Sequence, residues 1–177
     1  LAAVMLPKAE EATMIAAVAQ ATGKPIIALI ESARGLANAR AVAASGWVTR
    51  LAFGSIDYCA DLGCAHLRDV LLPARAELVL ASRLADLEPP LDGVTAQIDD
   101  ATAAFDDATH ARALGFAGKL SIHPRQVPDV LRAFAPTAEE VSWAKRVLGS
   151  GDGAVRVDGA MVDAPVRAKA RAILEER

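Results

Sequence analysis

The chain has 177 residues, of which 53% are hydrophobic, and a formal net charge of −3. This length supports one domain with a substantial core, and the composition excludes a disordered chain. The absence of a basic stripe disfavours nucleic-acid binding, and no apolar run approaches the ~18 residues of a membrane span. Cys59 and Cys64 have no Cys or His partners at zinc-binding spacing, so we expect reduced thiols in a cytoplasmic protein.

The predicted elements alternate between strands and helices. Short apolar runs that stop at a turn or polar residue predict strands, and apolar residues at helical spacing predict helices. The expected strands are 2–7, 25–31, 50–55, 91–94 and 118–123. The expected helices are 10–21, 33–45, 67–87, 100–114, 126–134 and 138–148. After these come a Gly-rich link at 149–153, a strand at 155–157, a hairpin turn at Asp158-Gly159 and a last helix over 166–176.

The strand-helix alternation predicts an α/β fold with a parallel sheet and crossover helices. The spacing of the strands fits the units of a TIM (β/α)8 barrel. Five such units cannot close an eightfold barrel, so we expect about three more to precede Leu1. The predicted organisation is a partial TIM-barrel catalytic domain over residues 1–148 and a C-terminal helix and hairpin appendage over residues 149–177.

Acidic residues follow two of the expected strands. Glu31 ends the run IIALI, and Asp57 follows Gly54-Ser55 just after a second apolar run. The carboxyl ends of parallel strands meet at one rim, where α/β enzymes carry their chemistry. Two carboxylates that converge there suit Mg²⁺, which is held by one or two carboxylates together with water and substrate.

Simpler interpretations of the same residues stay open. The two acids could be surface residues, or could pair with Arg34 and Arg50. Gly54 and Ser55 form either a plain turn or a pair of backbone N–H donors for the carboxylate of a 2-oxo acid. Asp61 is interpreted as an acid at a helix start.

Six short motifs occur in a fixed order: LPKAE at 6–10, IALIESARG at 27–35, FGSIDYCADLG at 53–63, LDGV at 91–94, GKLSIHP at 118–124 and DGAMVDAP at 158–165. Together they resemble the citrate lyase beta subunit-like family of the HpcH/HpaI aldolase/citrate lyase superfamily, a group of Mg²⁺-dependent TIM barrels. Each motif alone is weakly specific, but the ordered set covers essentially the whole chain.

The resemblance implies roles for three acids. Glu31 and Asp57 match the family's Mg²⁺ ligands. Asp163 matches a catalytic Asp that reaches a neighbouring subunit of a homotrimer, so residues 149–177 are expected to pack on that neighbour. From the sequence alone, Asp163 is also a good N-cap before Pro165. The family's substrate-binding arginine lies on strands that are not represented here, and no residue of this chain is assigned to it.

The resemblance further implies a Mg²⁺-dependent carbon–carbon lyase. Its substrates would be a CoA thioester and a 2-oxo acid, with a 3-hydroxyacyl-CoA such as citryl-CoA or malyl-CoA cleaved or formed. Two alternatives remain open. One is a pyruvate-type 2-oxo acid aldolase of the same superfamily, and the other is a catalytically silent, truncated barrel.

Overall fold

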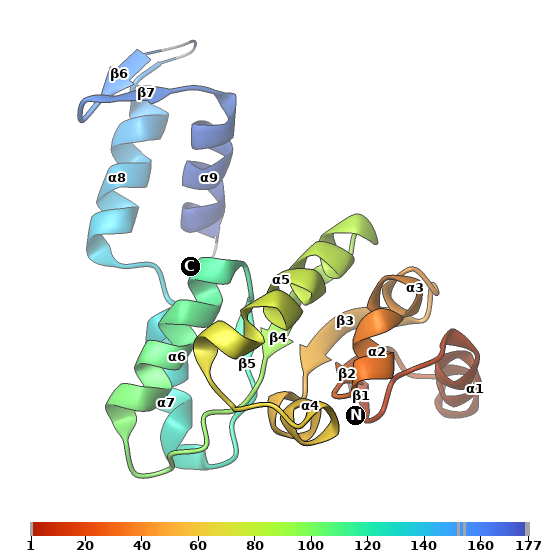
Figure 1. Cartoon of the computed structure of the whole chain (residues 1–177). Coiled ribbons are helices and arrows are strands. Elements are labelled where there is room, and N and C mark those ends of the chain that lie inside the picture. The colour runs from red at the N-terminus through yellow and green to blue at the C-terminus, as the bar shows by residue number, and fades with distance from the viewer. Residues whose placement is uncertain (1, 152, 154, 176–177) are drawn as a thin grey trace. The chain divides into compact units, whose positions relative to one another are not determined.

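The computed structural model describes residues 2–151, 153 and 155–175 (Figure 1). The chain forms two compact units, Leu1–Phe134 and Ala135–Arg177. The division falls earlier than the expected boundary after residue 148, because helix α8 (Ala138–Gly149) packs with the last helix of the chain. Within the described residues, no helix combines the length and the apolar character that crossing a membrane requires.

The first unit is built on a parallel five-stranded sheet, as the sequence predicted. The strand order follows the chain: β1 (Val4–Leu6), β2 (Ile26–Ile30), β3 (Val48–Phe53), β4 (Glu88–Asp92) and β5 (Gly118–Lys119). When crossovers of one hand join strands in sequence order, their helices lie on the same face of the sheet. The pattern along β2 fits this arrangement, since Ile26, Ala28 and Ile30 are buried while Ile27 and Leu29 are half-buried.

The helices of this unit occupy the expected segments with two changes. They are α1 (Ala12–Thr22), α2 (Ala33–Ala37), α3 (Ala39–Ala43), α4 (Ser55–Leu62), α5 (Arg68–Leu84), α6 (Ala101–Leu114), the 3₁₀ turn η1 (Pro124–Gln126) and α7 (Val127–Phe134). The helix expected over 33–45 is broken at Asn38, whose side chain donates to the backbone carbonyl of Glu10. A further short helix, α4, occupies a segment expected to be a loop.

Two strands also differ from the expectation. The strand expected at 91–94 begins at Glu88 and includes Pro89 and Pro90. These prolines are tolerated because β4 pairs with β3 irregularly, with a register shift between Arg50 and Ala52. The expected strand 118–123 is also shorter, because His123 caps the turn η1 by accepting from the backbone N–H of Arg125.

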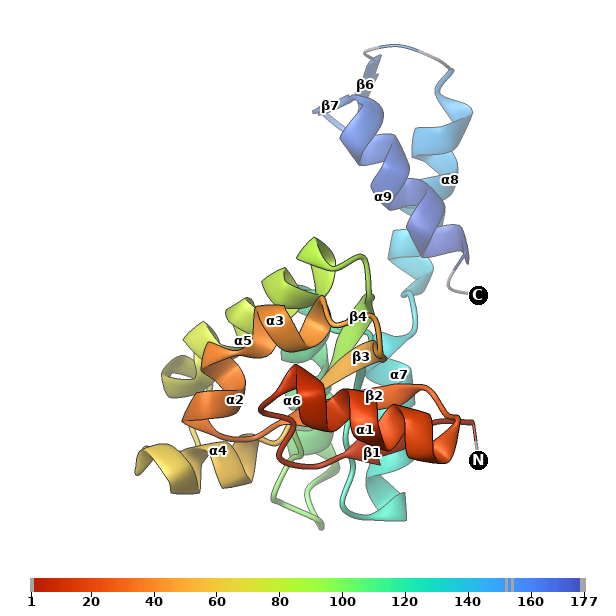
Figure 2. The same cartoon turned by 90° about the vertical axis from the view of Figure 1, so that its right-hand side faces the viewer.

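The core of the first unit lies between the sheet and its helices. Its largest fully buried side chains are Phe53, Ile15, Ile26, Ile30, Leu51, Leu71, Leu78 and Val42. Helix α5 packs on β3, β4 and α3, and α1 lies against β2 (Figure 2). These contacts fix the carboxyl ends of β2 and β3 beside each other, which is where the acidic motifs fall.

The second unit is a helical hairpin with a small β-ribbon. Figure 1 shows α8 and α9 (Ala164–Glu175) side by side, joined through the antiparallel strands β6 (Val155–Val157) and β7 (Ala160–Val162). Asp158 and Gly159 both have positive φ, at 50° and 83°, as the predicted hairpin turn requires. The last helix begins two residues earlier than expected, and its expected end at residue 176 lies outside the described residues.

The packing of α5 gives a stability prediction. Leu78 and Leu80 both belong to α5, but Leu78 is fully buried, whereas Leu80 is exposed. Leu78→Ala should lower the free energy of unfolding by about 2–5 kcal/mol, because it removes buried contacts and leaves a cavity. Leu80→Ala is the matched control and should cost less than about 1 kcal/mol in urea denaturation followed by circular dichroism. Equal losses in the two variants would contradict this placement of α5.

Candidate active site

Glu31 is fixed at the carboxyl end of β2. It follows Ile30 directly and is only 5% exposed. Its Oε1 accepts a hydrogen bond from the backbone N–H of Lys8 at 2.9 Å, which ties it to the segment after β1. The next residue, Ser32, caps α2 by accepting from the N–H of Gly35. The carboxylate is therefore pinned between a strand end and a helix start.

Asp57 comes from the element that follows the neighbouring strand. β3 ends at Phe53, and α4 begins at Ser55, so Asp57 lies in the first turn of a helix and not in the expected loop. A carboxylate in this position is favoured by the positive end of the helix dipole. Its side chain is 60% exposed, so it faces the solvent at the rim.

The two carboxylates converge on the ammonium group of Lys8. Lys8 Nζ lies 3.6 Å from Glu31 Oε1 and 3.4 Å from Asp57 Oδ1. The pKa of Lys8 is raised, since partial desolvation lowers it but the charges and hydrogen bonds of the two acids raise it more. The backbone of Lys8 has a φ of 49°, which is uncommon for a residue with a side chain.

The alternative partners considered for these acids are paired elsewhere. Arg34 Nε lies 3.8 Å from a carboxylate oxygen of Glu10, and Arg50 Nη2 lies 3.2 Å from one of Glu88. The rim acids are thus not held by the arginines nearest to them in the sequence.

This arrangement fits a hard cation. The Lys8 ammonium shows that one positive centre can lie within reach of both carboxylates. Among the described residues, no group of three or more His, Cys, Asp or Glu side chains could hold a metal ion. Two carboxylates completed by water and substrate oxygens are the donor set typical of Mg²⁺.

Gly54 leaves room for the Glu31 side chain because it has no side chain of its own. A Cβ at this position would lie 2.4 Å from Glu31 Cβ and 2.7 Å from Glu31 Oε2. Its N–H donates to the carbonyl of Ile30 at 2.8 Å and is not free for a substrate, contrary to the expectation for Gly54. The N–H of Ser55 is the first of α4, and such groups have no partner within their own helix.

Ser55 has an additional contact that the sequence did not predict. Its side chain is buried, and its Oγ lies 2.9 Å from His66 Nε2. Asp61, near the end of α4, accepts from the backbone N–H of Ala33 at 2.7 Å. It therefore does stabilise a helix start, but that of α2 instead of its own helix.

Asp163 lies in the second unit, whereas Glu31 and Asp57 lie in the first. Its Oδ1 accepts from the N–H of Val166 at 3.2 Å, and its carbonyl accepts from Arg167. This is the N-cap geometry that the sequence alone indicated. One carboxylate oxygen is used in the cap, so the cap and a role in catalysis are compatible.

A buried ionic cluster at the ends of β4 and β5 was missed from the sequence. Asp92 is fully buried, with Arg75 Nε 2.8 Å from its Oδ1 and Lys119 Nζ 3.2 Å from its Oδ2. Burial lowers the pKa of Lys119, although the charge of Asp92 opposes this. The available signal was Arg75 itself, a charged residue at helical spacing with the inward-facing Leu71 and Leu78.

The surroundings of Cys59 and His123 give neither side chain a catalytic role. Burial and the neighbouring Cys64 raise the pKa of the Cys59 thiol to about 11, so it stays protonated and weakly nucleophilic. His123 accepts a local backbone hydrogen bond in its cap.

A parallel α/β sheet with two converging carboxylates at its carboxyl rim defines a class, the α/β proteins with a candidate cation-dependent active site. The comparisons narrow this class. The sequence profile of the HpcH/HpaI aldolase/citrate lyase family matches residues 1–124. The citrate lyase subunit beta-like protein of Mycobacterium tuberculosis (strain H37Rv) is 37% identical over 97% of this chain and 65% of its own.

Two more relatives agree. The mitochondrial citramalyl-CoA lyase of Rattus norvegicus is 29% identical over 84% of this chain and 49% of its own. The crystal structure of CitE from Mycobacterium tuberculosis in complex with magnesium, acetoacetate and coenzyme A matches with a TM-score of 0.88 and 35% identity, over 99% of this chain and 68% of that one. The chain belongs to the HpcH/HpaI aldolase/citrate lyase family, and it spans about two thirds of the length of its citrate lyase beta-like relatives.

The close approach of Gly54 to Glu31 yields a prediction. Gly54→Ala should push the Glu31 side chain aside and lower the free energy of unfolding by about 1–3 kcal/mol, as overpacking does. Gly149→Ala, where the new Cβ would meet no atom within 4 Å, is the control and should be neutral or slightly stabilising. Urea denaturation measures both. A Gly54→Ala protein as stable as the control would contradict the packing described.

Proposed function

We propose that this protein is a Mg²⁺-dependent carbon–carbon lyase of the citrate lyase beta-like group. It cleaves or forms a 3-hydroxyacyl-CoA thioester, such as citryl-CoA or malyl-CoA, with an acyl-CoA and a 2-oxo acid as the other partners. The observation that carries the proposal is the convergence of Glu31 and Asp57 on one cation position. The relative solved with magnesium, acetoacetate and coenzyme A supports the same class of ligands.

The five parallel strands are part of a TIM (β/α)8 barrel in this proposal. Strand order that follows the sequence, with the helices on one face, is the arrangement from which such barrels are built. Glu31 and Asp57 then lie at the carboxyl-terminal face of the barrel, where active sites of this fold are found.

Each site residue has a distinct role. Glu31 and Asp57 would hold the Mg²⁺ ion, which, when bound, stabilises negative charge on the oxygens of the 2-oxo acid. The N–H of Ser55, at the positive end of α4, orients the substrate carboxylate beside the two acids. Asp163 moves the proton at the reacting hydroxyl group. Lys8 would have to leave its position between the two acids for them to hold the cation.

Asp163 acts on a neighbouring chain of a homotrimer, with residues 149–177 packed on that neighbour. Met161, two residues before Asp163, is 69% exposed on β7, and an apolar side chain at this position suits burial in a subunit interface. Cys59 and Cys64 are free thiols, in keeping with a cytoplasmic protein.

An aldolase acting on pyruvate and an aldehyde is the second candidate, because the matching family includes aldolases. One activity screen distinguishes the lyase from the aldolase. The protein is assayed with citryl-CoA, malyl-CoA and related thioesters, and with pyruvate plus aldehydes, each with Mg²⁺ and with chelator. The lyase proposal expects Mg²⁺-dependent release of a 2-oxo acid from a thioester. Turnover of aldehydes alone would favour the aldolase, and no turnover in any arm would indicate a silent barrel.

Removal of one rim charge tests the metal site. Asp57→Asn should weaken Mg²⁺ binding by more than the ~10–100-fold that loss of a supporting residue costs, because it removes one of two ligand charges. Asp61→Asn is the matched control, since Asn keeps the acceptor that Asp61 offers to Ala33. Isothermal titration with Mg²⁺ measures both variants. An unchanged dissociation constant for Asp57→Asn would end the proposal for this ligand.

Asp163→Ala separates proton transfer from metal binding. It should leave the Mg²⁺ affinity nearly unchanged and lower kcat by about 10²–10⁴, the usual contribution of a positioned acid or base. Glu31→Ala should lose metal binding and activity together.

Mixing these two inactive proteins tests the shared site. After co-refolding, some interfaces combine intact Glu31 and Asp57 with an intact Asp163 from the next chain, so partial activity should return. Light scattering and native mass spectrometry must show that hybrid trimers formed. If such hybrids bind Mg²⁺ and stay inactive, Asp163 does not act across an interface.

A further inference from the structure

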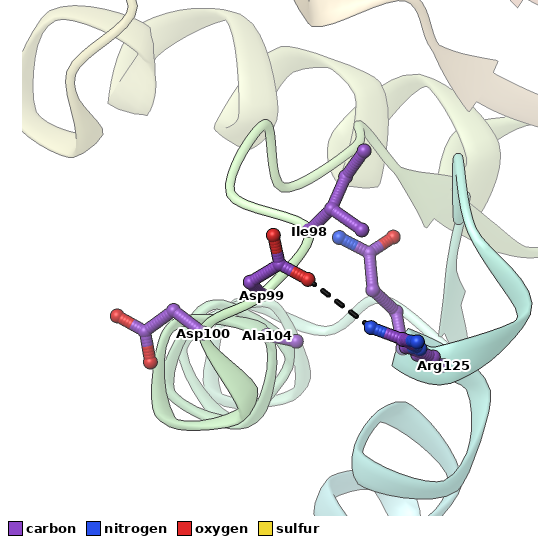
Figure 3. A pocket seen from close by; sticks show the side chains of 6 residues that line it. Ile98, Asp99, Asp100, Ala104 and Arg125 are labelled. Atoms are coloured by element: carbon purple, nitrogen blue, oxygen red, sulfur yellow. Dashed lines mark hydrogen bonds and ion pairs between the residues drawn. The ribbon is translucent and has the colours of Figure 1, made fainter.

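Two cavities of the first unit that lie away from the rim acids differ in their polar groups. One, of about 140 Å³, is lined by Ile98, Asp99, Asp100, Ala104, Arg125 and Gln126 (Figure 3). There Asp99 Oδ1 lies 3.3 Å from Arg125 Nη1, and both side chains are mostly exposed to solvent. An exposed ion pair of this kind contributes little to stability, and because its two charges are already paired, it does not indicate a ligand site.

The other cavity, which we name the α5–α6 pocket, has a volume of about 180 Å³. It is lined by His66, Leu67, Arg68, Leu71, Arg75, Ala96, Gln97 and Asp107. These residues come from the segment just before α5 and its first half, the loop after β4 and the middle of α6. The volume is several times the ≈ 30 Å³ that one water occupies in the liquid, so a small ion with accompanying water fits.

Arg75 leaves one donor unused in this pocket. The side chain is 5% exposed, and its Nε and Nη2 donate to the two carboxylate oxygens of Asp92. Its Nη1 is buried and has no hydrogen-bond partner among the described residues. A buried charged donor without a partner is destabilising, so its presence calls for a ligand or water that accepts from it.

The charges around the pocket leave an excess of positive charge. Lys119 and Arg75 both contact Asp92, which neutralises only one of them. The other acid, Asp107, accepts two hydrogen bonds from Arg68 at 3.1 and 2.8 Å and one from Thr95 at 2.7 Å. This connected set thus holds three cations and two carboxylates, and Arg68, Arg75 and Asp107 of it line the pocket.

The pKa values of two residues that line the pocket, His66 and Asp107, are shifted by these charges. The pKa of His66 is lowered by burial and then by the charges of Arg75 and Lys119. The pKa of Asp107 is held low because its hydrogen bonds with Thr95 and Arg68 outweigh the effect of burial. The cations Arg75 and Lys119 thus add to the effect of burial on His66, and Arg68 is the charged partner of Asp107.

The pocket also lies at the N-terminus of a long helix. α5 has 17 residues and begins at Arg68, so its first backbone N–H groups have no partners within the helix. Such groups, with the positive end of the helix dipole, favour anions and especially phosphate. Asp69 in this first turn is an exposed acid and does not line the pocket.

We propose that the α5–α6 pocket binds a phosphate group, either as inorganic phosphate or as the end of a phosphomonoester. Arg75 Nη1, Arg68 and the first amides of α5 are its donors. His66, which lines the pocket, contacts Ser55 at the start of the helix that carries Asp57. The bound phosphate is therefore one side chain away from the candidate active site. The proposal does not depend on the lyase function.

Isothermal titration tests the site, with inorganic phosphate and glycerol 3-phosphate as probes at ionic strength held constant with NaCl. The wild-type protein should bind phosphate with a Kd of roughly 1 mM or tighter. Arg68→Gln should weaken binding at least about tenfold, because it removes a charged partner. Arg75→Lys keeps a charge beside Asp92 but lacks Nη1, and should weaken binding similarly. Arg40→Gln is the control, since Arg40 also makes a bidentate pair, with Glu77 on α5, outside the pocket.

A crystal soaked in selenate locates the ion, which should give an anomalous peak within hydrogen-bond distance of Arg75 Nη1. Tighter binding of the monoester than of phosphate would identify the natural group as an ester, and equal binding would identify free phosphate. No binding up to about 20 mM would overturn the proposal. So would an equal loss in Arg68→Gln and Arg40→Gln, since the effect would then be general. If Arg75→Lys fails to fold, Arg68→Gln and the soak still decide.

Discussion

The position of Lys8 between Glu31 and Asp57 is the interaction on which the candidate active site depends. Two carboxylates at neighbouring strand ends repel each other, and a positive charge between them offsets this repulsion. Lys8 supplies it with its ammonium group, at 3.6 and 3.4 Å, and its backbone N–H binds Glu31 as well. For this to occur, the ends of β1, β2 and β3 must lie side by side, which the parallel register provides.

Asp92, a buried carboxylate, is also paired with positive charge, which Arg75 and Lys119 supply. The Arg75–Asp92–Lys119 cluster is buried, so its charges are tied by direct hydrogen bonds instead of by solvent. A buried charge without a partner is strongly destabilising, and the cluster therefore connects α5, β4 and β5 into one arrangement. At the rim, by contrast, the side chains of Lys8 and Asp57 are more than half exposed. In the buried cluster, Arg75 Nη1 has no hydrogen-bond partner among the described residues.

Much of this could be predicted from the sequence, and the misses have physical reasons. Apolar runs and helical spacing located the parallel strands, and the acids at their ends followed from the geometry of such sheets. At the break in the helix expected over 33–45, the side chain of Asn38 contacts a distant residue, Glu10, which local propensity does not encode. For Gly54, both a plain turn and donation of its N–H to a substrate were open from the sequence. Its N–H donates to the carbonyl of Ile30, and its missing side chain leaves space for Glu31.

Lys8 follows a strand end, so the sequence placed it on the rim, either paired with an acid of the site or in contact with a substrate. The structure bears out the pairing and extends it, because Lys8 lies within reach of both acids. The buried cluster was missed because its three members lie far apart in the sequence and become partners only through the packing of α5 on β4 and β5. For Asp163, in contrast to the buried cluster, the local contacts could be predicted from the sequence. The sequence indicated its N-cap geometry correctly, while its proposed role in catalysis depends on a neighbouring chain.

The most direct measurement is a crystal structure of the protein grown with Mn²⁺, whose anomalous scattering marks a site suited to Mg²⁺. The account predicts one strong anomalous peak in contact with carboxylate oxygens of both Glu31 and Asp57, with Lys8 Nζ moved away from its place between them. A fully occupied peak elsewhere, with Lys8 still bridging the two carboxylates, would contradict it.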